Sequence, residues 1–342
     1  MEKIYREVRC VWNTVQCAVQ GKGHVKTGTP CQDRTYHVKQ NNVDVIALAD
    51  GAGSANMSHY GAKFVTMKIC QLLSEQFEMY YNEEDGAAVK RVIIGILLEG
   101  LEQLSNKFNC DIKDMASTLL VVAIHDGKYI ILHIGDGVIG YVKNDELKVA
   151  SHPENGEFVN TTIFVTSKDA LATMKLMKGQ LNGITGFTLM SDGTETSLYD
   201  KKEKKLAPVL KKMMDLLKLM DSDCLQLEIE KSFEKVIKNS TSDDCSIILF
   251  VEEDLDFDGY RKLTSEQKRK MLGIRADSNY KKRIKRYDEI LEYTTTARNM
   301  IQISKRFFLK KKYCQRHIEL LLERNLLISY NGFLYTAVIM EK

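Results

Sequence analysis

The sequence predicts an α+β fold in which antiparallel β-sheets are covered by helices, followed by a small, basic and mainly helical domain. Strand-like runs occur in groups separated by long helical segments, unlike the one-by-one alternation of a parallel sheet. The pair Asp126-Gly127 joins two apolar runs, which is a strong hairpin signal. The charge also divides along the chain, with 29 basic and 36 acidic residues in 1–254 but 20 basic and 10 acidic residues in 255–342.

The first third of the chain predicts three strands and then two helices. Residues 11–20 form an apolar run typical of a strand, and 21–34 are rich in Gly and Thr and predict a loop. Residues 35–39 and 43–49 predict two strands around an Asn-Asn turn. From 58 to 81, and again from 86 to 107, apolar residues recur at spacings of three and four, as on one face of a helix.

The middle of the chain predicts a strand series and then helices. Strands are expected at 117–125, 128–135, 138–142, 146–151, 160–166, 186–191 and 245–251, with helices over 205–240. The Met-rich segments in 174–220 favour a core-facing helix or a flap over a peptide-binding groove.

An acidic, turn-rich stretch at 252–259 marks the expected domain boundary, which gives domains 1–254 and 260–342. The end of the chain predicts a basic helix, a strand, an Asn331-Gly332 turn and another strand, which resembles a winged helix in outline. Its basic residues could contact nucleic-acid phosphates. An accessory domain with a solvated basic face is the favoured interpretation, so nucleic acid is an open but not favoured partner.

Composition excludes several classes of protein. Hydrophobic residues make up 44% and charged residues 28% of the 342 residues, as in a globular protein, and no apolar stretch reaches the roughly 18 residues of a membrane helix. The first residues carry no apolar signal segment, and the eight cysteines are scattered without a CxxC pair. We therefore expect a cytoplasmic protein with reduced thiols and no membrane partner.

Four short acidic motifs stand out, and each abuts an apolar run: CQDR at 31–34, ADGAG at 49–53, MSDGTE at 190–195 and TSDDCS at 241–246. Carboxylate, carbonyl and water oxygens are the ligands that Mg²⁺ and Mn²⁺ favour. Four such strand ends brought together would make an acidic pocket that needs cations. The sequence therefore predicts a metal site built from these motifs.

The order of these motifs, with GDG at 135–137 as a fifth element, resembles the metal-dependent serine/threonine protein phosphatases of the PPM (PP2C) family, in its compact bacterial branch. The resemblance covers about residues 10–251, and its best stretch is GHVKTGTPCQDR followed by VIALADGAGSANMSHYGA. It implies two stacked antiparallel sheets flanked by helices, a site with two Mn²⁺ or Mg²⁺ ions, and a phosphorylated protein as substrate. A cognate serine/threonine kinase stays open as a partner.

The resemblance also implies roles for individual residues. Asp50 matches the carboxylate that bridges both ions, the Gly51 carbonyl should bind one of them, and Asp33 matches the carboxylate of the first motif. Asp192 and Asp243 match two carboxylates on the other ion. An aspartate at the position of Asp136 joins Asp192 at a weaker third ion in family members.

The implied reaction is direct attack on phosphorus by hydroxide held between the two ions, since metal binding lowers the pKa of water from about 16 toward 7. Two departures from the family pattern bear on this reaction. Ala52 stands where well-studied eukaryotic members have a histidine proposed as general acid, and the phosphate-binding arginine before the first motif is missing. His24 and Lys26 are the candidates for proton donation or phosphate contact.

Two interpretations from other classes remain beside the enzyme. One is a catalytically weak module that senses phosphorylated partners through the same pocket, favoured by Ala52 and the missing arginine. The other is a nucleic-acid-associated regulator acting through the basic domain. A dinucleotide site at IALADGAGSAN is rejected, because Asn56 replaces the third glycine of G-x-G-x-x-G and Asp50 would repel a pyrophosphate.

Overall fold

The computed structural model describes residues 12–153, 162–219, 222–252, 257–324, 326–330 and 332–336. They form two compact units, of which the larger contains Trp12–Met214 and Leu225–Glu252 and the smaller contains most of the chain after residue 252. The predicted boundary near 254–260 stays a prediction, because residues 253–256 lie outside the described part of the chain.

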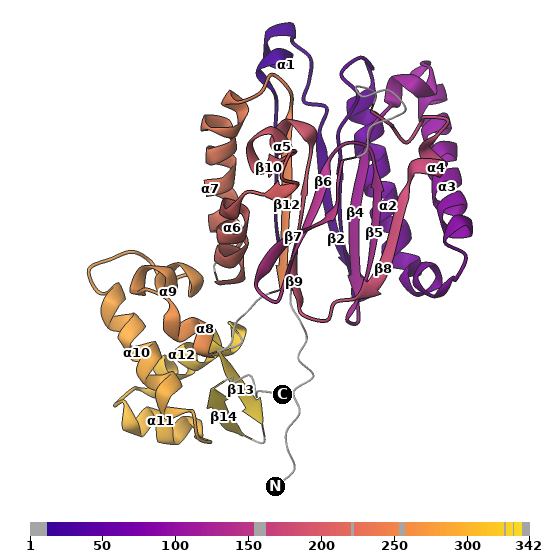
Figure 1. The fold of residues 1–342 in the computed structure, drawn as a ribbon. Coiled ribbons are helices and arrows are strands. Elements are labelled where there is room, and N and C mark those ends of the chain that lie inside the picture. The colour runs from indigo at the N-terminus through magenta and orange to yellow at the C-terminus, as the bar shows by residue number, and fades with distance from the viewer. Residues whose placement is uncertain are drawn as a thin grey trace. The chain divides into compact units, whose positions relative to one another are not determined.

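Two five-stranded antiparallel sheets make up the larger unit (Figure 1). The first sheet has the strand order β1 (Trp12–Val19), β12 (Cys245–Glu252), β9 (Ile184–Met190), β6 (Val138–Lys143) and β7 (Glu146–Ser151). The second has the order β2 (Arg34–Gln40), β3 (Val43–Ala49), β4 (Leu119–His125), β5 (Lys128–Ile134) and β8 (Lys175–Gln180). The first and last strands of the unit, β1 and β12, pair with each other, so the first sheet joins the two ends of the unit.

Helices cover the outer faces of both sheets. The long helices α2 (Ser58–Asn82) and α3 (Gly86–Phe108) lie on the second sheet. On the other side, α6 (Pro208–Leu219) and α7 (Ser222–Lys235) flank the first sheet, where the Gln226 side chain accepts a hydrogen bond from the backbone N–H of Gln16 on β1, at 3.0 Å. The predicted α+β fold class is therefore confirmed.

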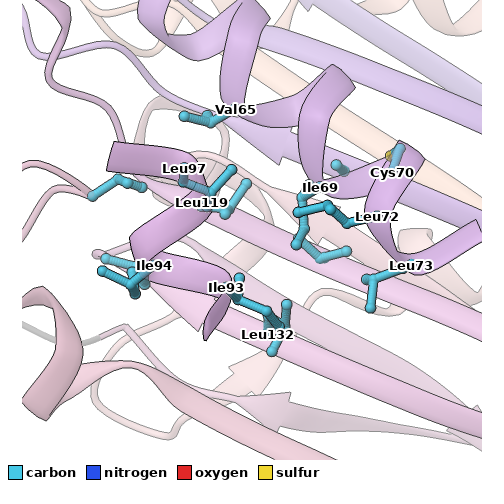
Figure 2. Packing of buried hydrophobic residues seen from close by; sticks show 14 of the residues in the cluster. Val65, Ile69, Cys70, Leu72, Leu73, Ile93, Ile94, Leu97, Leu119 and Leu132 are labelled. Atoms are coloured by element: carbon cyan, nitrogen blue, oxygen red, sulfur yellow. The ribbon is translucent and has the colours of Figure 1, made fainter. Parts of the chain in front are cut away.

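The alternation of side chains along β3 and β4 explains why these strands are largely apolar; Asp44 of β3 is a buried exception that pairs with His37 and Lys39. Val45, Ala47 and Val121 pack under α2 and α3, in the cluster that Figure 2 shows. Their neighbours Ile46 and Leu48 point to the opposite face and meet the first sheet. A central strand that is buried on both faces has no place for the polar residues of a half-exposed strand.

Tight turns connect the hairpins as the sequence predicts. Asp126 and Gly127 both have positive φ, 44° and 73°, as do the two asparagines at 41 and 42. Asn, Asp and Gly adopt this left-handed region more readily than other residues. Asp126 therefore belongs to a hairpin and not to the acidic site.

Three local predictions were wrong. The loop 21–34 contains a short helix, α1 (Lys22–Thr27), which begins after Gly21. The segment 175–180, expected as a helix or flap, is the edge strand β8, because pairing with β5 outweighs its helix-like composition. Of the strand expected at 160–166, residues 160 and 161 lie outside the described residues, and the rest is a loop whose Val165 is buried and donates its N–H to the carbonyl of Ser117, at 2.8 Å.

Short elements complete the larger unit. They are η1 (Ile112–Met115), α4 (Ala170–Thr173), α5 (Asp192–Leu198), β10 (Tyr199–Asp200), β11 (Lys205–Leu206) and η2 (Ile237–Asn239). None of the helices in the described part of the chain is long and apolar enough to cross a membrane.

The smaller unit is mainly helical and ends in a hairpin. Its elements are α8 (Phe257–Lys262), α9 (Ser265–Met271), α10 (Tyr280–Tyr293), α11 (Met300–Arg306), α12 (Lys311–Glu323), β13 (Leu327–Tyr330) and β14 (Phe333–Thr336). It has its own apolar core, to which α10 contributes Ile284, Ile290 and Leu291. Thr294 and Thr336 join their hydroxyl groups at 2.8 Å inside it and fix β14 to the end of α10.

One buried histidine in the larger unit predicts acid sensitivity. His133 on β5 is 1% exposed, and its Nδ1 lies 2.6 Å from Oγ of Ser151 on β7. Burial, helped by the charge of Lys175, lowers the pKa of His133 to about 3. In the unfolded chain this histidine binds a proton near pH 6.5, so its contribution to stability is complete above that pH and is lost as the pH falls.

The unfolding free energy of the wild type should fall with decreasing pH between pH 6 and pH 4. We expect the slope of this fall to be smaller in His133→Asn, by about 1 kcal/mol per pH unit. Urea unfolding at several pH values measures this slope. His125→Asn is the matched control, because His125 lies at the half-buried end of β4. Equal slopes for the wild type and His133→Asn would contradict the prediction.

Candidate metal centre

Strand register places the acidic motifs at one end of the sandwich. Arg34 of β2 pairs with Ala49 of β3, so Asp33 and Asp50 follow at the same edge of the second sheet. In the first sheet, Met190 of β9 pairs with residues at the starts of both β12 and β6. The residues just beyond these strand ends are Asp192, Asp243 and Asp136, and β5 ends at the same edge before Asp136.

The burial of these carboxylates differs. Asp33 is fully buried, and neither of its carboxylate oxygens has a hydrogen-bond partner among the described residues. One oxygen of Asp192 is buried and unpartnered in the same way. Asp50 and Asp136 are half-buried, and Asp243 is exposed. A buried carboxylate without a hydrogen bond is costly, so this pocket is built for a positive charge.

The pKa shifts show that these groups share one space. Burial raises the pKa of Asp33 to about 7. Burial also raises the pKa of Asp50 well above its usual value, and the charges of Asp33, Asp192 and Asp243 raise it further. For Asp192 the pKa is raised by burial and by the charges of Asp136 and Asp243. Carboxylates from all four motifs and from GDG therefore repel one another when ionised.

The donor set fits a hydrated hard cation. Within the described ranges, no three Asp, Glu, His or Cys side chains are arranged to hold one ion by themselves. Mg²⁺ usually keeps several water ligands and takes only one or two carboxylates from the protein. Carboxylate oxygens without a hydrogen-bond partner suit that mode of binding better than a closed protein cage.

Asp244 holds the loop of the first motif in place. It is 1% exposed, and its two carboxylate oxygens accept hydrogen bonds from the backbone N–H groups of Gly21, at 2.6 Å, and Gln32, at 2.5 Å. The side chain of Gln32 in turn donates to the carbonyl of Ala55 and, at 2.6 Å, to Oγ of Ser58. Asp244 is thus a buried clamp between the first and fourth motifs.

The glycine after Asp192 is required by a close approach of two backbones. A Cβ on Gly193 would lie 2.0 Å from the carbonyl oxygen of Asp244. Around Asp50 the chain is fixed by Thr118, whose Oγ1 accepts from the Asp50 N–H at 2.9 Å and whose N–H donates to the Asp50 carbonyl at 2.8 Å. The two motifs are therefore held rigidly at the ends of their strands.

His24 and Lys26, the two candidates for proton donation, make different contacts. His24 on α1 places Nδ1 2.9 Å from Oδ1 of Asp244, so it belongs to the clamp. Lys26 is exposed on the same helix, and no ion pair joins it to an acidic residue of the described chain. Neither residue contacts the carboxylates of Asp33, Asp50 or Asp192 through a hydrogen bond in the described structure.

Sequence reasoning missed an ion pair beside the site in which only the carboxylate is buried. Glu195 on α5 is 1% exposed and pairs with Lys201, whose side chain is 69% exposed. Burial raises the pKa of Glu195, and the charges of Asp192 and Asp136 act on both members of the pair. The available signal was the spacing of Glu195 three residues after Asp192, which puts both on one side of a helix.

Comparison with known proteins identifies the family. The model of the family described as "Protein phosphatase 2C" matches residues 20–230, more than half of the chain. The chain belongs to the protein phosphatase 2C family. Both the family resemblance and the enzyme class predicted from the sequence, a protein serine/threonine phosphatase, are thereby confirmed, while the basic helical unit lies beyond the matched residues.

Individual relatives of this 2C-family chain are distant. Serine/threonine-protein phosphatase 3 of Escherichia coli K12 is 24% identical over 185 residues, which are 52% of this chain and 72% of that protein. The serine/threonine phosphatase of S. agalactiae superposes with a TM-score of 0.52 at 15% identity, over 71% of this chain and all of that one. For Stp1 of Staphylococcus aureus the TM-score is 0.50 at 16% identity, over 74% and 100%. These structures show that the fold is shared.

Proposed function

We propose that this 2C-family chain is a Mn²⁺- or Mg²⁺-dependent phosphatase that hydrolyses phosphoserine and phosphothreonine in proteins. The observation that carries the proposal is the group of carboxylates at the ends of β2, β3, β9 and β12, in which Asp33 is fully buried and neither of its oxygens has a hydrogen-bond partner among the described residues. Family membership supplies the enzyme class. The pocket supplies the reason why this chain would need cations.

In this proposal Asp33, Asp50, Asp192 and Asp243 would hold two ions, to both of which Asp50 would contribute, and the Gly51 carbonyl would be a further oxygen ligand. Asp136 and Asp192 are the pair for a weaker third ion. The ions, when bound, would lower the pKa of water and neutralise charge on the phosphoryl oxygens. With water as the nucleophile, no side chain of the protein would need to form a covalent phosphoenzyme.

The chain's own residues give the pocket its shape and keep its carboxylates in position. Asp244, His24 and Gln32 fix the loop that carries Asp33, and Thr118 fixes Asp50. Lys201 pairs with Glu195, and the charges of Asp192 and Asp136 act on it. Since Ala52 offers no proton, protonation of the leaving group falls to water, and a slow turnover is expected.

Hydrolysis of a phosphothreonine peptide by the purified chain tests this proposal. We expect turnover with Mn²⁺ and none with excess EDTA. Metal-independent turnover would overturn the metal-dependent mechanism. Binding of Mn²⁺ and phosphopeptide without turnover would favour the sensor module, for which Ala52 supplies a chemical reason.

For the basic domain, both predicted roles stay open: an accessory domain with a solvated basic face, and nucleic-acid binding. Exposed cations occupy the first half of α12, at Lys310, Lys311, Lys312 and Arg316. A solvated basic face on an accessory domain explains them at least as well as nucleic-acid binding does, so the phosphatase remains the proposed function.

A further inference from the structure

A basic groove lies on the larger unit between the strand β7 and the β10–β11 hairpin. It has a volume of about 450 Å³ and is lined by Lys148 and His152 on one side and by Lys204, Lys205 and Leu206 on the other. Among the described residues, no carboxylate belongs to this lining. We call this feature the basic groove.

The groove keeps a surplus of positive charge. Lys148 pairs with Glu146 at 2.8 Å and Lys205 with Glu203 at 3.5 Å, while no ion pair holds Lys204 among the described residues. Burial lowers the pKa of His152, and the charges of Lys204, which lines the groove, and of Lys175, which does not, lower it further. An anionic side chain placed there would face several cations.

The groove adjoins the acidic pocket through the hairpin. Nδ1 of His152 lies 2.8 Å from the hydroxyl of Tyr199, the first residue of β10. Tyr199 follows directly on α5, which begins at Asp192, and the charges of Glu195 and Lys201 act on Tyr199. The hairpin therefore carries Lys201, on which the charge of Asp192 acts, and also Lys204 and Lys205, which line the groove.

The hairpin is anchored, so the position of its lysines is defined. The side chain of Leu206 packs on Gly140 of β6, where an added Cβ would lie 2.4 Å from the leucine Cδ1. The N–H of Ala207 donates to the carbonyl of Leu198 at 2.8 Å and closes the base of the hairpin. The groove is thus a fixed surface beside the site, with apolar walls at Leu147 and Leu206.

We propose that the basic groove binds an acidic segment of the protein substrate next to the phosphorylated residue. This proposal rests on the proposed function, since the phosphoryl group must enter the acidic pocket while the groove holds the neighbouring chain. Opposite charge then selects among phosphoproteins: carboxylates near the phosphorylated residue favour binding, and basic residues there oppose it. The substrate class is therefore phosphoserine or phosphothreonine in an acidic sequence.

Two phosphothreonine peptides test the proposal, one with four Glu residues flanking the phosphorylated residue and one with Gln in their place. We expect kcat/KM to be about tenfold higher for the Glu peptide at low salt, mainly through KM, and the ratio to approach one in 0.5 M NaCl. A triple variant with Lys148, Lys204 and Lys205 changed to Gln should lose the preference but hydrolyse p-nitrophenyl phosphate as the wild type does.

The matched control changes three exposed lysines elsewhere, Lys107, Lys231 and Lys235, to Gln, and should keep the preference. Equal kcat/KM for the two peptides in the wild type, or an unchanged preference in the groove variant, would overturn the proposal. Fluorescence anisotropy with the labelled, unphosphorylated Glu peptide measures binding to the groove independently of turnover. If the peptide binds through the groove but is not hydrolysed, the proposed phosphatase mechanism is rejected and the groove proposal stands. If the peptide is hydrolysed but neither its binding nor the preference for Glu depends on the groove, only the groove proposal is rejected.

Discussion

Replacing Asp50 by Asn is expected to lower phosphopeptide hydrolysis in Mn²⁺ by about 10³-fold or more. In the proposed site this carboxylate lies between both ions, and an amide is a weaker and neutral ligand. The same substitution at Asp126 is the matched control, because Asp126 sits in a hairpin with φ of 44°, a conformation that Asn also adopts. Asp126→Asn should leave activity unchanged.

The same variant should be more stable than the wild type when metal is removed. Burial and three neighbouring carboxylates raise the pKa of Asp50 in the folded chain. A carboxyl group with a raised folded pKa reduces stability at every pH above its unfolded value, so at pH 7 its ionisation opposes folding. In EDTA, Asp50→Asn should therefore melt at a higher temperature than the wild type, and it should gain less stability from Mn²⁺.

Thermal melting in EDTA and in Mn²⁺, recorded beside the peptide assay, checks both expectations. If Asp50→Asn retained activity and the full stabilisation by Mn²⁺, Asp50 would not be a metal ligand. If it lost activity and also melted lower than the wild type in EDTA, the carboxylate would have a structural role in the apo fold.

The sequence predicts most of the framework because strand ends and turns are local features. Asp33 and Asp50 lie next to apolar runs, and the antiparallel register alone brings both to one edge. The long helices follow from the spacing of apolar residues, and the positive φ of Asp126 and Gly127 follows from their residue types.

The features that could not be predicted from the sequence depend on contacts between residues far apart in the chain. The segment that forms β8 becomes a strand because β5 offers it a free edge. The start of α1 is set by Gly21, where an added Cβ would lie 2.3 Å from the backbone of Asp243, more than 200 residues away. Glu195 belongs to the MSDGTE motif, but only folding brings Lys201 to Glu195 and the charges of both next to Asp136 and Asp192.

Asp243 and Asp244 are adjacent, and opposite results are expected for them. Asp244→Asn turns an amide NH₂ toward the backbone N–H groups of Gly21 or Gln32, so at least one buried N–H loses its acceptor. We expect a loss of about 1–3 kcal/mol in unfolding free energy. The loosened loop that carries Asp33 should weaken Mn²⁺ binding about 10- to 100-fold, while kcat at saturating Mn²⁺ falls much less.

Asp243→Asn should show the reverse pattern. Stability in EDTA should not fall, because Asp243 is exposed and its charge raises the pKa of Asp50. Activity should be lost, because a proposed ligand is gone. Urea unfolding and titration of activity with Mn²⁺ distinguish the two patterns. A normal stability together with a loss of kcat in Asp244→Asn would show that Asp244, and not Asp243, belongs to the metal site. The clamp seen in the structure argues against that exchange, since both oxygens of Asp244 are already occupied by backbone N–H groups.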